Sequence, residues 1–232
     1  MANERASRES VTVYLLPLGA GRYELYSEPS DDDGDAGDRR GFVRRRLDRL
    51  QDRWSAAVHD ARRADPGSGV FARWRDKAAC LAAEMIAEQR TLWMLRSVES
   101  AVLVHPSDLD ASGAATARDG ILERASRHHR VWSIIDFLLF IASGLLMLVP
   151  GPNVIAYYFG ARLIGHYLSW RGAYNALTRA EWRAHAEPAL TELGALASEP
   201  RETRAPRVEA IASRLKLQRL AAFFDRVAAP VH

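Results

Sequence analysis

The sequence predicts an α+β membrane protein that has a small three-stranded antiparallel sheet, long helices and one transmembrane helical hairpin. Two long apolar runs, 131–149 and 154–170, are separated by a Pro-Gly-Pro-Asn break. β-branched and aromatic residues cluster near residues 11–27 and again at 101–105, which is typical of strands. Most of the remaining chain shows helical periodicity.

The length of the two apolar runs favours a membrane hairpin. The runs hold about nineteen and about seventeen residues, and a bilayer core of roughly 30 Å needs about 20 helical residues with a lower limit near 17. A buried helical hairpin of a soluble protein is the alternative. It fits less well, because a helix packed at a surface carries a polar stripe, whereas the first run has Asp136 as its one charge.

The break at Pro150, Gly151, Pro152 and Asn153 predicts the membrane turn. Two prolines around a glycine stop one helix and start another, so two spans are expected rather than one long helix. Arginines flank both runs, and basic flanks stay on the cytoplasmic side. Both termini are therefore expected on the cytoplasmic side of the membrane. A re-entrant hairpin remains open.

This topology divides the chain into three parts. A cytoplasmic α+β domain covers residues 1–125, the transmembrane hairpin covers 126–172 with its turn at 150–153, and cytoplasmic helices cover 173–232. In the first part, two strands around a turn at 17–21 form a β-hairpin. The run at 101–105 supplies the third strand, because two strands alone are marginal.

The other segments are expected to be helical or solvated. The acidic run 30–38 has no apolar periodicity and predicts a flexible loop. Apolar residues at helical spacing predict further helices, and the one that follows the hairpin has an expected kink at Pro188. These predicted helices cover 40–63, 70–95, 114–130, 173–198 and 208–228.

Composition and motifs exclude several classes. The net charge is only +3, and no nucleic-acid motif accompanies the arginines, so no nucleic-acid partner is expected. The single cysteine, Cys80, excludes an internal disulfide framework. No phosphate loop, nucleophile elbow or metalloprotease helix is present. The sequence therefore predicts no enzyme, no catalytic residue, no cofactor and no metal site.

Three ionisable residues lie within the apolar runs: Asp136 in the first, Arg162 and His166 in the second. If the turn is centred between residues 151 and 152, residue n lies level with about residue 303 minus n of the other helix, which follows from the shared rise per residue. Asp136 then comes within reach of His166 and Arg162. These residues form either a proton or cation relay or an ion pair that fastens the hairpin. The position of Asp136 near the start of its run favours the ion pair.

A stripe of small residues predicts the packing face of the second helix. Ala161, Gly165 and Ser169 repeat at every fourth position, which places them on one side of a helix. Small side chains allow close approach of a neighbouring helix. The first helix is expected to pack there.

Four sequence stretches carry a resemblance to a known family. They are VYLLPL, RYELYSEP, LVHPSDL and LLMLVPGPNVIAYYFGARLIGHYLSWRGA. With them the chain resembles the mitochondrial potassium/proton exchange-related family over roughly residues 10–228, most specifically in the last stretch. It differs from a mitochondrial member in its N-terminus, which is not transit-like, and its arginine- and alanine-rich composition suggests a bacterial relative. The expected location is therefore the bacterial plasma membrane, and the alternative is the mitochondrial inner membrane.

The resemblance implies an integral membrane protein of potassium/proton exchange or homeostasis. A lone hairpin cannot enclose an ion pathway, so the chain is expected to act as an oligomer or as an accessory component. The expected partners are the lipid bilayer and a second copy or another membrane protein. The alternative function is a non-transporting membrane-anchored adaptor that recruits a cytoplasmic partner.

Overall fold

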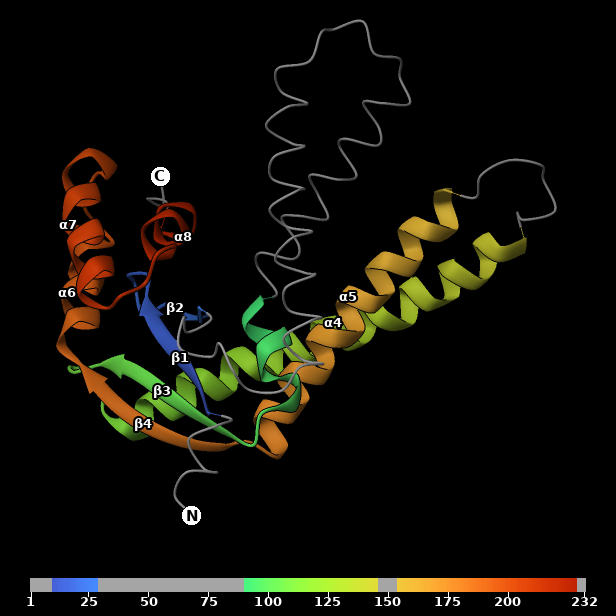
Figure 1. Cartoon of the computed structure of the whole chain (residues 1–232), viewed down its shortest axis with the longest axis horizontal. Helices are drawn as coiled ribbons and strands as arrows, with labels where there is room; N and C mark the ends of the chain where they lie inside the picture. The colour runs from blue at the N-terminus through green and yellow to red at the C-terminus, as the bar shows by residue number, and fades with distance from the viewer. Residues whose placement is uncertain (1–9, 29–89, 146–153, 229–232) are drawn as a thin grey trace, which may run out of the picture. The chain divides into compact units, whose positions relative to one another are not determined.

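The computed structural model describes residues 10–28, 90–145 and 154–228. These residues divide between two compact units. The first unit contains 10–28, 94–126 and 171–228, and the second contains 90–93, 127–145 and 154–170. Figure 1 labels the elements. The predicted helix 40–63, the acidic loop 30–38, most of the predicted helix 70–95 and the predicted turn 150–153 lie outside the described residues.

A four-stranded mixed sheet organises the first unit. Its order is β2-β1-β3-β4, in which β1 and β2 are antiparallel while β1–β3 and β3–β4 are parallel. The strands are β1 (Ser10–Pro17), β2 (Tyr23–Tyr26), β3 (Ser100–Pro106) and β4 (Glu181–Glu187). The predicted sheet of three antiparallel strands is therefore wrong in strand number and in the direction of β3, whereas the antiparallel β1–β2 hairpin is confirmed.

The turn between β1 and β2 depends on unusual backbone geometry. Gly19, Ala20 and Gly21 have φ angles of 80°, 52° and 69°, a region that glycine adopts without steric cost. The backbone N–H of Leu18 donates to the carbonyl of Arg22 at 2.9 Å and closes the loop. The local sequence therefore accounts for this hairpin.

Strand β4 replaces part of a predicted helix. Its sequence, Glu-Trp-Arg-Ala-His-Ala-Glu, contains few strand-forming residues, so its extended state comes from its pairing with β3 along the whole length. The predicted kink at Pro188 is instead the start of the next helix. The side chain of Glu187 accepts the backbone N–H of Ala189 at 3.1 Å, and proline at the first helical position needs no donor.

Three helices cover one face of the sheet: α6 (Pro188–Leu196), α7 (Arg201–Arg214) and α8 (Leu220–Val227). Leu16 and Val104 of the sheet join the apolar core that these helices form. Within it, the guanidinium of Arg204 is 1% exposed and donates to the carbonyl of Ala228 at 2.6 Å. The polar group is thus satisfied in part by the end of α8.

Two long helices pass through both units: α4 (Ala111–Leu145) and α5 (Val154–Thr178). In the first unit, the guanidinium of Arg118 on α4 lies over the ring of Trp182 on β4 at 4.7 Å. Asn175 on α5 donates to the carbonyls of Leu95 and Val98, both at 2.9 Å. These contacts connect the helices to the sheet and to the segment before β3.

The predicted transmembrane hairpin is contradicted. Among residues 10–28, 90–145 and 154–228, the structure contains no helix that combines the length and the apolar character a bilayer crossing requires. In α5, Arg162 and His166 interrupt the apolar sequence, and in α4 the apolar residues continue a strongly charged first half. The membrane assignment fails, and with it the predicted location in a plasma or mitochondrial inner membrane.

Candidate functional site

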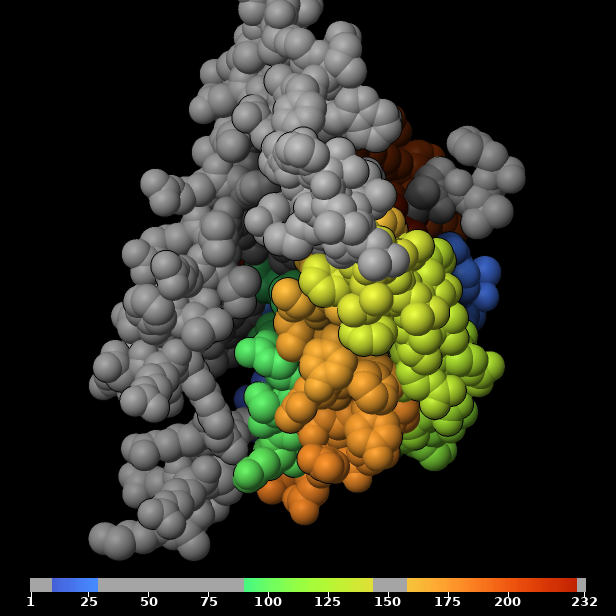
Figure 2. All heavy atoms as spheres, turned by 90° about the vertical axis from the view of Figure 1, so that its right-hand side faces the viewer, coloured from blue at the N-terminus to red at the C-terminus, as the bar shows by residue number. Residues whose placement is uncertain are grey.

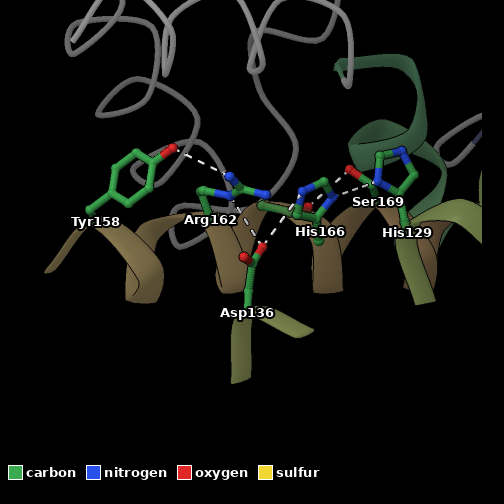
Figure 3. Close-up of polar contacts among 7 residues, drawn as sticks. His129, Asp136, Tyr158, Arg162, His166 and Ser169 are labelled. Atoms are coloured by element: carbon green, nitrogen blue, oxygen red, sulfur yellow. Dashed lines mark hydrogen bonds and ion pairs between the residues drawn. The ribbon is translucent and has the colours of Figure 1, made fainter. Parts of the chain in front are cut away.

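The second unit contains a polar cluster between α4 and α5, which lie side by side (Figures 1 and 2). Figure 3 shows its side chains converging from the two helices. Its centre is Asp136, which has no exposed surface. Arg162 Nε donates to Asp136 Oδ2 at 3.3 Å, and His166 Nε2 lies 3.7 Å from the same oxygen. The structure thus brings the three ionisable residues singled out from the sequence together.

Helical spacing explains why α5 supplies two partners. Tyr158, Arg162 and His166 follow one another at intervals of four residues, so they share one face of the helix. The Tyr158 hydroxyl accepts a hydrogen bond from Arg162 Nη1 at 3.3 Å. On α4, the ring of Trp132 lies 5.3 Å from the Arg162 guanidinium, within the range of a cation–π contact.

His129 extends the cluster along α4. Its Nδ1 lies 2.8 Å from Nδ1 of His166, and the two rings are 5.1 Å apart. The sequence analysis did not single out this residue, because it precedes the first apolar run, 131–149. The spacing of seven between His129 and Asp136 places both on one helix face and was the signal that could have identified it.

The short contact between the two histidines limits the protons they can hold. One Nδ1 must donate and the other accept, because two N–H groups cannot face each other at 2.8 Å. A neutral pair satisfies this, and so does a pair with one extra proton on His166, whose Nε2 then faces Asp136. Two imidazolium rings would oppose donor to donor, so the pair holds at most one extra proton.

Burial keeps this pair neutral at neutral pH. Burial, reinforced by His166 and His128, lowers the pKa of His129 to about 4. Burial also lowers the pKa of His166 from its ordinary value, although the charge of Asp136 acts in the opposite direction. Both shifts follow from the cost of placing a charge in a desolvated site.

Arg162 keeps its charge. Burial alone would lower its pKa, but the hydrogen bond with Tyr158 and the charge of Asp136 outweigh that effect and raise the pKa above its ordinary value. The guanidinium and the carboxylate therefore neutralise each other. The cluster behaves as an internal ion pair with a neutral histidine pair beside it.

Two polar atoms of α4 stay without a hydrogen-bond partner among the described residues. They are Asp136 Oδ1 and the hydroxyl of Ser133, which lie one helical turn apart and are both buried. The other carboxylate oxygen, Asp136 Oδ2, accepts the hydrogen bond from Arg162 and lies near His166 Nε2. One oxygen of the carboxylate is thus unpaired, and helical spacing places Asp136 and Ser133 on the same side of α4.

The small-residue stripe divides between two environments. Gly165 and Ser169 are buried, whereas Ala161 is exposed. The Ser169 hydroxyl donates a hydrogen bond to the carbonyl of Gly165 at 2.9 Å. It also accepts a hydrogen bond from the indole N–H of Trp93 at 2.8 Å. Another glycine, Gly160, has the ring of Phe140 3.3 Å from the position a Cβ would take. This close contact of an α4 side chain with a glycine of α5 therefore lies outside the predicted stripe.

Within the described ranges no group of three or more His, Cys, Asp or Glu side chains is placed to hold a metal ion.

Comparison of the chain with protein-family models, with curated proteins and with solved structures finds no match.

Proposed function

We propose that the chain is an accessory component of monovalent cation/proton homeostasis that acts through contacts of its α4–α5 hairpin and carries no ions itself. One observation supports the accessory role: the buried carboxylate of Asp136 is already paired with Arg162. A cation would have to displace a fixed guanidinium to bind there. The cation/proton process itself is proposed from the sequence resemblance.

The histidine pair supports the same conclusion. A proton carrier needs a group whose pKa lies near the working pH. His129, with a pKa of about 4, does not change charge near neutral pH. Two helices also enclose no pathway. The polar cluster is better suited to holding α4 and α5 together than to moving protons.

The outer surface of the hairpin supports a binding role. All but one of the large apolar side chains that are exposed in the described chain belong to its described residues, 127–145 and 154–170. Leu138 and Ile164 are the most exposed, at 61% and 60%. Contiguous apolar surface of this kind marks interaction sites. The same observation favours a second candidate function, an adaptor that recruits a partner in a process unrelated to ion balance.

A complementation experiment separates these functions. Cells that lack the chain are challenged with high external potassium, and their potassium content and internal pH are measured. The proposed function predicts that both are disturbed, that the unaltered chain restores them and that Leu138→Glu restores them poorly. His166→Gln should restore them almost fully, because the histidine pair carries no protons and the glutamine amide can still donate and accept hydrogen bonds within the cluster. Undisturbed ion content in the deletion cells would leave only the adaptor.

A flux measurement tests the accessory role directly. The purified chain is incorporated into or added to potassium-loaded vesicles that contain a pH-sensitive dye. Exchange is expected to equal that of protein-free vesicles. Potassium/proton exchange by the chain alone, abolished by Asp136→Asn, would contradict the proposal.

A further inference from the structure

In its second half, α4 buries polar side chains and exposes apolar ones, which is the reverse of an ordinary surface helix. The side that faces α5 carries His129, Ser133 and Asp136, all buried. The opposite side carries apolar residues spaced three, four and three apart, here called the outer seam. Its members and their exposed fractions are Val131 at 47%, Ile134 at 57%, Leu138 at 61% and Ile141 at 54%. Polar groups are thus inside, and aliphatic groups are outside.

The spacing of the outer seam is that of a coiled coil. Alternating steps of three and four place side chains along one narrow stripe that inserts into the same stripe of a second helix. Between residues 131 and 145, Asp136 is the one charged residue, and it is buried on the other side. No charge on this stretch therefore opposes the approach of an identical helix.

We propose that the outer seam of α4 binds the outer seam of a second copy of this chain. This inference rests on the proposed function, in which the hairpin is the interaction element, and it names the partner. A twofold axis lets one surface serve both copies. The second copy is the occupant that matches the seam in length, spacing and lack of charge.

The available area is sufficient. Ile135 and Phe137, which are 37% and 50% exposed, flank the four seam residues. If these six side chains lose all of their exposed surface, which is about half of roughly 150–200 Å² each, the two copies together bury at most about 1,000 Å². That is the size at which specific protein interfaces begin. Figure 2 shows the side chains of α4 in yellow-green as a continuous surface beside α5 in orange.

Flanking charge indicates that the two helices run antiparallel. Arg127 and Arg130 precede the seam and are exposed. A parallel pair would bring the arginines of both copies together, whereas an antiparallel pair separates them. A pair centred on residue 136 then places Val131 opposite Ile141 and Ile134 opposite Leu138.

Two matched variants test the interface. Leu138→Glu places a charge on the outer seam, and Leu139→Glu places the same charge on the next residue, which is 40% exposed and lies off the seam. The full chain is studied by analytical ultracentrifugation over a range of concentrations. The unaltered chain should dimerise. Leu138→Glu should weaken the dimer at least about 100-fold, because two apolar contacts are lost per dimer, and Leu139→Glu should weaken it less than about threefold.

Cross-linking tests the direction. In a Cys80→Ser background, Ile134→Cys and Leu138→Cys proteins are mixed and mildly oxidised. The mixed disulfide dimer is expected to form faster than either dimer of identical variants. Faster cross-linking of Leu138→Cys with itself would overturn the antiparallel arrangement.

The remaining outcomes also distinguish the two proposals. A chain that stays monomeric at every concentration overturns the inference, and so does one whose seam variants lose binding to lipid vesicles instead. If such a monomer still restores ion balance in deletion cells, the proposed function stands without the dimer. If the dimer forms as expected but deletion cells keep normal potassium and pH, the interface stands and the proposed function fails.

Discussion

Replacing Asp136 by asparagine removes the negative charge at the centre of the polar cluster. The guanidinium of Arg162 then loses its compensating charge, although the amide oxygen of the new side chain and the Tyr158 hydroxyl can still accept its hydrogen bonds. Breaking a fully buried ion pair costs about 3–5 kcal/mol. Because the Arg162 side chain is 24% exposed and part of it stays hydrated, the expected loss is about 2–3 kcal/mol.

The loss should be local to the hairpin. Hydrogen exchange with mass spectrometry measures the free energy of opening in peptides that cover 129–145 and 158–170. Asp119→Asn is the matched control. Asp119 pairs with its neighbour Arg118 at 2.7 Å but is 43% exposed, so its loss should cost less than about 0.5 kcal/mol.

A double variant separates the ion pair from simple packing. Asp136→Asn combined with Arg162→Gln leaves no uncompensated charge. It should therefore be less destabilised than the sum of the single variants, by about 1–2 kcal/mol. Single-variant costs below about 0.5 kcal/mol, or costs that add without coupling, would refute the assignment of an internal ion pair.

Three further predictions concern pH and packing. Burial lowers the pKa of His129 to about 4. Between about pH 6.5 and pH 4, His129 is therefore protonated in the unfolded chain but neutral in the folded chain. The free energy of hairpin opening should thus fall from pH 6.5 towards 4, by at most about 1.4 kcal/mol per unit. Hydrogen exchange should show a flatter profile for His129→Gln, and identical profiles would contradict this. Asn175→Ala removes the donor to two buried carbonyls and should lower the free energy of unfolding in urea by about 2 kcal/mol; a change below about 0.5 kcal/mol would count against it. Gly194→Ala brings a Cβ to 3.0 Å from Pro17 Cγ and should lower the melting temperature. Gly120→Ala, which meets only the flexible end of Arg124 at 3.5 Å, should raise it, so a rise in both would show that the contact with Pro17 is not tight.

The strands of the N-terminal half follow from local sequence. Runs rich in valine, leucine and tyrosine fall at β1, β2 and β3, where side-chain packing favours extended backbone. Strand β4 does not follow, because Ala184 and Ala186 carry no strand preference and their state depends on pairing with β3. The parallel direction of β1 and β3 depends on a long connection that local patterns do not specify.

The polar cluster was partly accessible from sequence. The spacing of Arg162 and His166 and a simple hairpin register place both near Asp136, where the structure has them. The role of His129 required the observed side-chain geometry. The membrane assignment was wrong, because Arg162 and His166 interrupt the apolar sequence of α5 and the apolar residues of α4 follow a strongly charged half, so that no described helix has the required apolar length. Sequence patterns also did not predict that the buried side of α4 is polar and its exposed side apolar.

The central claim is that the neutral pair His129–His166 and the ion pair Asp136–Arg162 hold the hairpin of α4 and α5 together. Nuclear magnetic resonance titration of the imidazole nitrogens of His129 and His166 tests it most directly. His129 should remain neutral from pH 8 to pH 6 and titrate at about 4, and the pKa of His166 should lie below its ordinary value. Titration of His129 between pH 6 and pH 8 would contradict the account and restore a proton-carrying role for the cluster.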